Sequence, residues 1–529
     1  MTMSSSSYDT TAYSSSSFPQ THPIKLAAIA RLFGMTPADP ARCSVLELGA
    51  ADGANLLPLA QIYPESSFVG IDLSENQVTE GRKVIEGAGL TNVSLEQKDI
   101  MDFDLGGRRF DYIIVHGVFS WVPSAVKDRI LSLCKESLTP DGVAYISYNA
   151  LPGWRMRGMI RDMMLYHTKQ FPDEATRTSQ ARSLVKFLSD NVPTEDNPYG
   201  QFLRSELATL ENVTDSYLFH EYLEEENAPM YFREFSAAAA RHGLQYLGEP
   251  ELSSILPANF DPRAQETLYK ISGDMIAMEQ YMDFLRNRTF RMTLLVHNDR
   301  VLNRNINPLM LRTMWFGTGA RPVNEKVDLK AGVIEHFHFK KSIVNADSPL
   351  VKAVLVSLYS SSPQYLHFSD LFSAVKNLLC GPVTGIHEST KAIEEEVVFC
   401  DQLLVLLSRG MIECLSFPHV PIASTLPEKP RISALARYQA LNYPRHVTNL
   451  RHHSIMFDSF ARHAMSLMDG TRNTRDIVRG MAEKSSEGAI TVTHHGRSIT
   501  DVDEIEALIA PRVIACIEQF PKLAMVLPS

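Results

Sequence analysis

Two glycines and one carboxylate have types and a spacing that suit the binding of a nucleoside. Gly49 and Gly53 follow an apolar run at 45–48, which is too short for a helix and is typical of a buried parallel strand. Glycine lets a ligand approach the backbone, because it has no Cβ. Asp72 ends the next apolar run, about 20 residues on, where a carboxylate can accept hydrogen bonds from ribose hydroxyls. This arrangement predicts a nucleoside site.

The charge of the turn argues against a pyrophosphate. A pyrophosphate-binding turn has three glycines and no acidic side chain, whereas Glu47 and Asp52 accompany only two glycines here. Acids at this place suit a ligand with cationic groups, such as the amino group and the sulfonium of S-adenosyl-L-methionine. The alternative is a glycine turn that merely closes a sheet, and the position of Asp72 favours the nucleoside site over it.

Alternating strands and helices must position these residues. The pattern predicts a helix over 54–62 and a strand over 67–71, and the capping-box pair Ser74 and Gln77 opens a helix over 75–88. Further predicted elements are strands over 93–97, 110–115 and 143–148 and a helix over 124–138. Such alternation indicates an α/β fold with a parallel, Rossmann-like sheet, in which ligands bind at the carboxyl ends of the strands.

The chain resembles the class I S-adenosylmethionine-dependent methyltransferases, and among them the bacterial enzymes that carry a methyltransferase regulatory domain. The stretches that carry the resemblance are FPQTHP, VLELG, FVGIDLS, DYIIVHGVFSWVP and SYNALPGW. This group includes rickettsial enzymes that methylate lysines of outer membrane proteins. The match is continuous from about Tyr8 to His297 and looser through the C-terminal third. One departure is Ala51, where the family has glycine, and its methyl group is expected to weaken the cofactor site without abolishing it.

The resemblance implies a site for S-adenosyl-L-methionine. The cofactor-binding residues carried over are Tyr13, Glu47, Gly49, Ala51, Gly53, Asp72, Leu73, Asp99, Ile100 and His116. Tyr13 belongs to a leader that folds over the pocket in this family, although a terminal segment whose tyrosines do nothing is the open alternative. Asp99 and Ile100 lie where the family holds the adenine amino group, and a solvated loop acid is the alternative for Asp99.

Four side chains are candidates for catalysis. His116 follows the strand at 110–115 and is expected beside the sulfonium, where an imidazole can serve as a base, but a lone histidine is more often structural. Trp121 can line an acceptor channel, since an aromatic face attracts an ammonium, and core packing is at least as consistent with it. Tyr148 and Asn149 end the next strand, and the resemblance makes them candidates for orienting the acceptor nitrogen.

Five regions are expected. They are a leader over 1–40, the methyltransferase core over 41–154 and 228–298, a helical insertion over 155–227, a middle winged-helix-like domain over 299–430 and a C-terminal one over 431–529. The helix and two strands that complete a seven-stranded mixed sheet are expected only at 231–243, 244–250 and 289–297. Relatives dimerise through an extra helical module, which makes the insertion a candidate dimerisation module. The segment at 276–291 resembles the regulatory-domain signature and shows no catalytic chemistry.

Composition narrows the function classes. The 529 residues carry a formal net charge of −10 and no basic recognition helix, so protein docking is expected of the winged-helix-like modules rather than nucleic-acid binding. Six single cysteines, and the pairs His452-His453 and His494-His495, lack metal-ligand spacing, so no metal site is expected and the histidines are read as surface residues. The first 18 residues do not resemble a signal peptide and no run is long enough to span a membrane, which favours a cytoplasmic protein.

The leading hypothesis is therefore a methyltransferase that uses S-adenosyl-L-methionine and acts on a lysine-bearing protein. Displacement at a sulfonium needs alignment and exclusion of water, and desolvation in an apolar channel lowers the pKa of a lysine amine, so no dedicated base is required. The alternatives are a small-molecule N- or O-methyltransferase and a non-catalytic regulator that binds the cofactor. The large C-terminal half argues against a small-molecule methyltransferase, because a small acceptor does not require further domains. Ala51 is consistent with a non-catalytic regulator.

Overall fold

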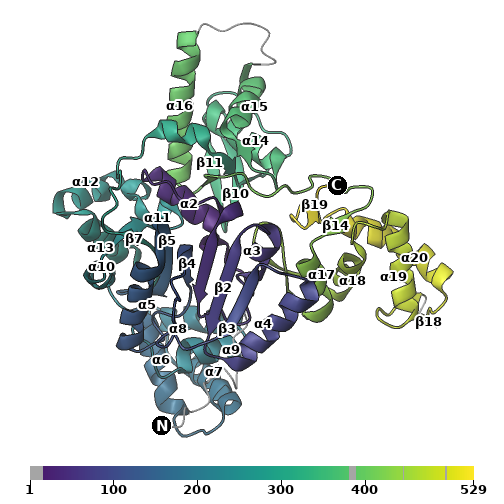
Figure 1. The fold of residues 1–529 in the computed structure, drawn as a ribbon, viewed down its shortest axis with the longest axis horizontal. Coiled ribbons are helices and arrows are strands. Elements are labelled where there is room, and N and C mark those ends of the chain that lie inside the picture. The colour runs from purple at the N-terminus through teal and green to yellow at the C-terminus, as the bar shows by residue number, and fades with distance from the viewer. Residues whose placement is uncertain (1–15, 381–388, 445, 495–496) are drawn as a thin grey trace.

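A computed structural model describes residues 16–380, 389–444, 446–494 and 497–529. Its centre is a seven-stranded mixed sheet in the order β3-β2-β1-β4-β5-β7-β6 (Figure 1). The strands are β1 (Ser44–Leu48), β2 (Ser67–Asp72), β3 (Val93–Gln97), β4 (Phe110–Val115), β5 (Leu138–Asn149), β6 (Leu244–Gly248) and β7 (Phe290–His297). Only β7 runs against its neighbours β5 and β6. The predicted Rossmann-like core is confirmed, and the strand order reverses between β1 and β4, where such sheets bind ligands.

Helices cover both faces of the sheet. One face packs on α2 (Pro23–Leu32), α3 (Leu57–Ile62) and α4 (Glu75–Ala88), and the other packs on α5 (Ser124–Ser137) and α10 (Phe232–Arg241). The boundaries of α4 are those predicted, because the Ser74 hydroxyl accepts from the backbone N–H of Gln77 and Gly89 adopts a left-handed conformation after the last turn. The turn before α3 continues to Leu56, so this helix is shorter than the predicted 54–62.

The helical insertion comes between β5 and β6. It contains α6 (Trp154–Thr168), α7 (Glu174–Asn191), α8 (Pro198–Leu210) and α9 (Asp215–Leu218), followed by a π-helical turn at Phe219–Leu223. These helices have a hydrophobic cluster of their own, which includes Ile160, Val185 and Leu203. Between β6 and β7 lie α11 (Leu252–Ile255), α12 (Pro262–Ile271) and α13 (Met275–Arg286). None of the helices in the described residues is long and apolar enough to cross a membrane.

The buried side chains of the middle region, 299–430, belong to the same hydrophobic cluster as one face of the central sheet. Its elements are β8 (Trp315–Gly317), β9 (Arg321–Pro322), β10 (Glu335–Phe339), β11 (Ser342–Ala346), α14 (Pro349–Ser361), β12 (Leu366–His367), α15 (Phe368–Cys380), α16 (Ser389–Ser408) and β13 (Glu413–Leu415). Helices α14 to α16 with the small sheet β12-β8-β13 give the winged-helix-like order that the sequence predicts. Figure 1 shows α16 projecting from the top of the molecule.

The C-terminal domain lies beside α3 and α4 (Figure 1). It contains β14 (Arg431–Ile432), α17 (Ala434–Asn442), β15 (His446–Thr448), β16 (Ser454–Met456), α18 (Ser459–Leu467), α19 (Thr474–Ser486), β17 (Thr493–His494), β18 (Arg497–Ser498), α20 (Val502–Ile517) and β19 (Val526–Leu527). Leu435 of α17 packs against Leu57 and Val84, and its backbone N–H donates to Gln61 Oε1 at 3.0 Å.

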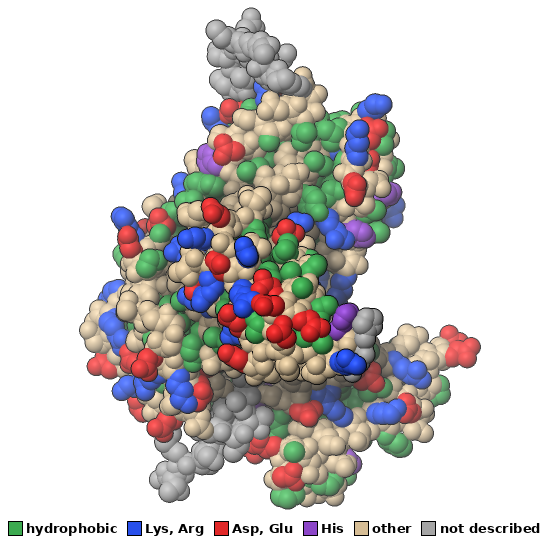
Figure 2. All heavy atoms as spheres, turned by 90° about the vertical axis from the view of Figure 1, so that its right-hand side faces the viewer, with side chains coloured by type: hydrophobic (Ala, Val, Ile, Leu, Met, Phe, Trp, Pro, Cys, Tyr) green, Lys and Arg blue, Asp and Glu red, His purple; other side chains and the backbone are tan. Residues whose placement is uncertain are grey.

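Acidic and basic side chains are interspersed on the face of the molecule that Figure 2 shows.

Candidate active site

The turn between β1 and α3 has a backbone that only small residues tolerate. Gly49, Ala51 and Gly53 all have positive φ, at 76°, 49° and 78°. A Cβ on Gly49 would lie 2.4 Å from Val118 Cγ2, so any larger residue would collide with that side chain. The glycine therefore lets Val118 pack directly against the turn at the ends of β1 and β4, where the sequence predicts the cofactor.

Ala51, where the family has glycine, has a left-handed backbone conformation with a φ of 49°. Its backbone N–H donates to Asp72 Oδ2 at 2.8 Å, while the backbone N–H of Ser74 donates to Oδ1 of the same carboxylate at 2.9 Å. The first bond joins the glycine turn to the end of β2, and the second fixes the carboxylate at the start of α4. A left-handed conformation is unfavourable for alanine, so the turn maintains its shape against a local strain.

Replacing Ala51 with glycine is expected to raise the free energy of unfolding by about 1 kcal/mol, because glycine adopts a positive φ without a Cβ penalty. Urea unfolding of the wild type and of Ala51→Gly measures the difference. The matched control is Ala54→Gly, a half-buried residue of the same turn at which φ is not positive, and this change should destabilise. A lower midpoint for Ala51→Gly would contradict the strain.

The residues expected on the adenosyl side lie along the ends of β2 and β3. Asp72 ends β2, and the next side chain, Leu73, is exposed. Asp99 Oδ1 accepts from the backbone N–H of Met101 at 2.8 Å, which fixes the loop after β3. Ile100 is half-buried and packs against the core on the α5 side of the sheet. Carboxylates and apolar side chains thus alternate along this edge, which suits the ribose and the flat face of an adenine.

Glu47 is a buried carboxyl group at the end of β1. Its Oε1 accepts from Asn55 Nδ2 at 2.9 Å, and its Oε2 is buried without a hydrogen-bond partner among the described residues. Burial, opposed by the Asn55 bond and reinforced by the charges of Asp72 and Asp52, raises the pKa of Glu47 to about 8. An unpaired buried oxygen costs free energy, and a cationic amino group placed against Oε2 would remove that cost. The site therefore fits the charged end of the predicted cofactor.

Binding of S-adenosylhomocysteine near pH 7 is expected to release a proton from Glu47. The ammonium group of the ligand favours the carboxylate, so it lowers a pKa that burial has raised to about 8, and affinity should rise with pH until the carboxyl group is ionised. Titration calorimetry in two buffers of different ionisation enthalpy measures the released proton. Glu47→Gln should release none, and equal proton release from this variant and the wild type would contradict the assignment.

His116 follows β4 and is held by two hydroxyl groups. Its Nδ1 lies 3.0 Å from Tyr145 Oη and 3.1 Å from Ser147 Oγ, both on β5. The Phe18 ring packs on it with a centroid separation of 4.1 Å. Burial lowers the pKa of His116 to about 4, so the imidazole is neutral at neutral pH and a weak base.

The two residues that end β5 point to opposite faces of the sheet. Asn149 shares a face with Ser147, and its Nδ2 is buried without a partner among the described residues. Tyr148 points the other way: its hydroxyl lies 3.2 Å from Thr293 Oγ1, and its ring stacks on Phe235. The structure thus brings Asn149 and His116 to the same side of the sheet and places the Tyr148 side chain in the core.

Trp121 is half-buried in the loop after β4. Its ring meets the buried Trp154 ring edge-on, with centroids 6.4 Å apart. Trp154 begins α6, so this contact joins the loop after β4 to the insertion. Tyr13, the remaining candidate, lies outside the described residues.

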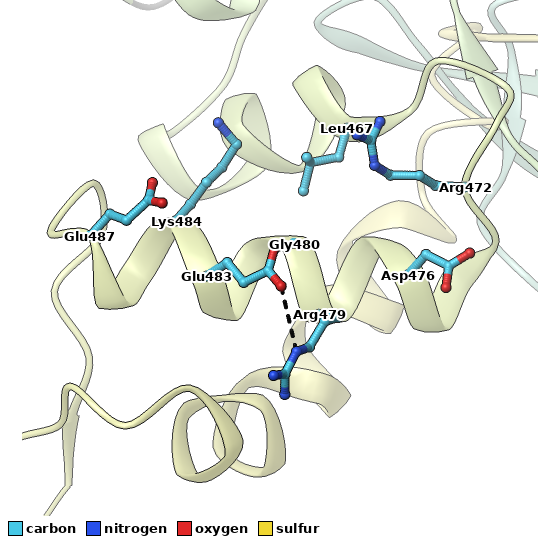
Figure 3. A pocket seen from close by; sticks show the side chains of 8 residues that line it. All are labelled: Leu467, Arg472, Asp476, Arg479, Gly480, Glu483, Lys484 and Glu487. Atoms are coloured by element: carbon cyan, nitrogen blue, oxygen red, sulfur yellow. Dashed lines mark ion pairs between the residues drawn. The ribbon is translucent and has the colours of Figure 1, made fainter.

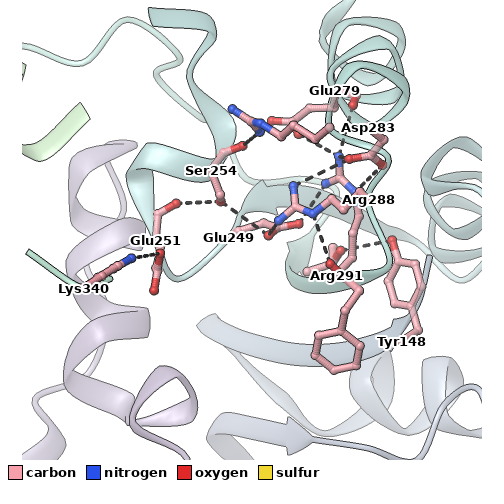
Figure 4. A network of polar contacts seen from close by, with 12 residues as sticks. Tyr148, Glu249, Glu251, Ser254, Glu279, Asp283, Arg288, Arg291 and Lys340 are labelled. Atoms are coloured by element: carbon pink, nitrogen blue, oxygen red, sulfur yellow. Dashed lines mark hydrogen bonds and ion pairs between the residues drawn. The ribbon is translucent and has the colours of Figure 1, made fainter. Parts of the chain in front are cut away.

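A buried ion network, which the sequence analysis did not predict, supports β7, the strand next to β5. Arg291 of β7 is fully buried and pairs with Glu249 at 2.9 Å and with Asp283 at 2.7 Å. Its other ion pair joins Glu279 at 2.9 Å, and Arg288 pairs with Glu249 and Asp283 (Figure 4). Three acids face two arginines, and burial raises the pKa of Glu279 to about 7 although Arg291 opposes the shift.

The network acts on the end of β5 through strand pairing. Arg291 lies opposite Tyr148 in the ladder, and Phe290 lies opposite Asn149. The guanidinium of Arg291 also lies over the Phe232 ring, 3.8 Å from its centroid. The sequence predicts no catalytic chemistry in the segment at 276–291. In the structure this segment supplies charged side chains that hold β7, the strand that pairs with Asn149 of β5.

A groove of about 410 Å³ lies far from the strand ends, on α19 of the C-terminal domain (Figure 3). Both arginines that line it are in ion pairs: Arg479 contacts Glu483, Asp503 and Glu506, and Arg472 contacts Asp469. Within the part of the chain that the structure describes, no group of three or more His, Cys, Asp or Glu side chains has a metal-binding arrangement.

Comparison with known proteins agrees with this geometry. Three family descriptions match: "Methyltransferase domain" at 45–142, "Predicted methyltransferase regulatory domain" at 214–297 and "PKMT, C-terminal winged helix domain" at 428–525. The uncharacterized protein RP789 of Rickettsia prowazekii (strain Madrid E) is 36% identical over 521 residues, which cover 97% of this chain and 92% of that protein. The uncharacterized protein RP028 of the same organism is 40% identical over 241 residues, or 46% of this chain and 96% of that protein.

A solved structure matches nearly the whole chain. PKMT2 from Rickettsia typhi in complex with AdoHcy superimposes with a TM-score of 0.85 at 30% sequence identity, covering 98% of this chain and 100% of that one. The likeness therefore extends through the insertion, the middle region and the C-terminal domain as well as the sheet.

Proposed function

Since this chain belongs to the class I S-adenosylmethionine-dependent methyltransferases, in the group with a methyltransferase regulatory domain and a PKMT winged-helix domain, we propose that it methylates lysine side chains of a protein. The observation that carries this proposal is the match to PKMT2 over 98% of this chain and all of that one. A small acceptor would need only a lid over the core, whereas the shared architecture includes two further domains.

In this proposal each end of the cofactor has its own residues. Glu47 receives the amino group, Asp72 the ribose, and Leu73, Asp99 and Ile100 the adenine, while Gly49, Ala51 and Gly53 keep the turn open and His116 lies near the sulfur. Tyr13 of the leader, which lies outside the described residues, is carried over from the resemblance as a cofactor-binding residue. When bound, the cofactor supplies a methyl group already activated by the positive charge on sulfur.

The acceptor side needs orientation and exclusion of water more than a base. His116, with a pKa lowered by burial to about 4, is a poor proton acceptor, which favours an amine that arrives neutral. The aromatic rings of Phe18 and Phe290 lie beside it and exclude water, and desolvation lowers the pKa of a lysine amine. Asn149 is placed to orient the acceptor nitrogen, Trp121 lines the approach from α6, and Tyr148 acts only through the packing of β5.

The remaining proposals concern assembly and location. The helices at 155–227 form the dimerisation module of a homodimer, and the protein works in the cytoplasm on a lysine-bearing protein without binding nucleic acid. The five regions are 1–40, 41–154 with 228–298, 155–227, 299–430 and 431–529. The separate hydrophobic cluster of α6 to α9 supports a distinct insertion. The net charge of −10, with acidic and basic side chains interspersed on the face that Figure 2 shows, supports protein docking over nucleic-acid binding.

The test is methyl transfer to a mixture that contains both classes of acceptor. The purified protein and methyl-labelled S-adenosyl-L-methionine are incubated with a detergent-solubilised bacterial membrane extract, and protein and low-mass fractions are separated by gel electrophoresis. Label on protein, located on lysine by mass spectrometry of tryptic peptides, is the expected result. Label only in the low-mass fraction would instead identify a small-molecule methyltransferase, and binding without label would identify a regulator.

A further inference from the structure

One buried amide joins three parts of the chain at the cofactor site. Asn55, in the turn before α3, donates through Nδ2 to Glu47 Oε1 at 2.9 Å and to Thr21 Oγ1 at 3.0 Å. Its Oδ1 accepts from the backbone N–H of Phe18 at 2.9 Å. The fourth partner comes from the C-terminal domain: His452 Nε2 lies 2.9 Å from the same Oδ1. The sequence reading of His452 as a surface residue is wrong, because its side chain is buried in this contact.

The direction of each bond follows from the chemistry of the partners. A backbone N–H can only donate, so the amide atom that faces Phe18 is the oxygen. His452 must then donate to that oxygen through Nε2, which leaves its Nδ1 as an acceptor. A neutral imidazole meets this requirement, and burial, together with the charges of His453, Lys25 and His419, lowers the pKa of His452 to about 3.

His452 occupies this position at a cost. It has a φ of 63°, in the left-handed region, and its Nδ1 is buried without a partner among the described residues. Both features are unfavourable for a histidine. Its neighbour His453 is exposed, so the two adjacent histidines differ in burial.

The strand that follows this loop, β16, also contacts the start of the described leader. Ser454 Oγ lies 3.2 Å from Ser16 Oγ and 3.0 Å from Ser17 Oγ. The leader, the turn before α3 and the C-terminal domain therefore meet at one place, directly behind the buried Oε1 of Glu47.

We propose that His452 is a positioning residue of the cofactor site, through which the C-terminal domain orients Asn55 and thereby Glu47. The His452 imidazole holds Asn55 Oδ1, so both hydrogens of Nδ2 stay directed at Glu47 and Thr21, and Glu47 keeps Oε2 turned toward the cofactor. The winged-helix domain is then part of the cofactor site. This inference rests on the proposed role of Glu47, and it does not depend on the identity of the methyl acceptor.

The experiment measures binding of S-adenosylhomocysteine to the full chain by titration calorimetry. His452→Ala removes one buried hydrogen bond to the relay, so affinity should fall about tenfold. His452→Gln places an N–H donor at a similar reach and should restore most of the affinity. His453→Ala, which removes the adjacent exposed histidine, is the matched control and should bind like the wild type.

A double-mutant cycle separates positioning from a general loss of structure. If His452 acts through Asn55 and Glu47, the effects of His452→Ala and Glu47→Gln on affinity should be strongly non-additive, because the second change removes the group that the first one positions. Additive effects, or an unchanged affinity in a His452→Ala protein with a lowered melting temperature, would show a purely structural histidine and overturn the proposal. If Glu47→Gln binds S-adenosylhomocysteine as tightly as the wild type, the proposed contact between Glu47 and the cofactor is wrong. The methyl-transfer test with protein acceptors does not depend on either of these binding results.

Discussion

Replacing Asp72 with alanine should lower the affinity for S-adenosylhomocysteine at least about 100-fold. The change removes the carboxylate expected to receive the ribose hydroxyls, and each charge-assisted hydrogen bond is worth about 1.5–3 kcal/mol. It also leaves the backbone N–H groups of Ala51 and Ser74 without the oxygens they now reach. Calorimetric titration of the purified variant measures the loss, and transfer of labelled methyl should disappear with it.

Two controls make the Asp72 result specific. Asp102→Ala removes an exposed acid from the loop after β3 and should leave affinity unchanged, which excludes a general effect of net charge. Asp72→Asn keeps one oxygen for the turn, so it should fold like the wild type and still bind weakly. An Asp72→Ala protein that binds within about threefold of the wild type would show that the ribose lies elsewhere.

Replacing Arg291 with methionine is expected to lower the free energy of unfolding by about 3–5 kcal/mol. The change leaves Glu249, Glu279 and Asp283 buried with Arg288 as their remaining ionic partner, and breaking a buried pair from one side is costly because the other charge stays uncompensated. Denaturant unfolding followed by circular dichroism measures the loss. An unchanged midpoint would mean that the acids become protonated or hydrated at little cost.

The pH dependence of the same network has a definite sign. Burial raises the pKa of Glu279 to about 7, above its ordinary value of 4.5, so its contribution to stability is present below about pH 4.5 and is lost as the pH rises through about 7. Glu279→Gln, which cannot ionise, is the matched control and should remove this part of the pH dependence. Glu279→Gln should lower the free energy of unfolding far less than Arg291→Met does.

Local patterns predicted the elements that carry the cofactor residues. The strands at 93–97 and 110–115 and the helix at 75–88 have the predicted boundaries, because alternating apolar residues, a serine cap and a final glycine act within a few residues of one another. The order of the sheet came from the resemblance, since nothing local in 155–227 shows that the chain will return to add β6 and β7.

Local sequence patterns could not predict contacts between residues that are far apart in the chain. His452 was read as a surface residue because its neighbours in sequence offer no partner, and its partner Asn55 lies 397 residues earlier. The charges around Arg291 come from β6, α13 and β7 and form a network only after these elements pack. For Ala51 the sequence showed a departure from glycine, but only the backbone angle shows that the turn keeps a glycine-like shape.

The meeting of distant segments at Asn55 has a consequence for biosynthesis. A ribosome makes Phe18, Thr21, Asn55 and Glu47 long before it reaches His452, so the nascent chain can build the sheet edge while the last bond to the amide is still missing. If that bond tightens the hold on the cofactor, an incomplete chain retains S-adenosyl-L-methionine poorly. Full occupancy then marks a finished polypeptide whose terminal domain has docked.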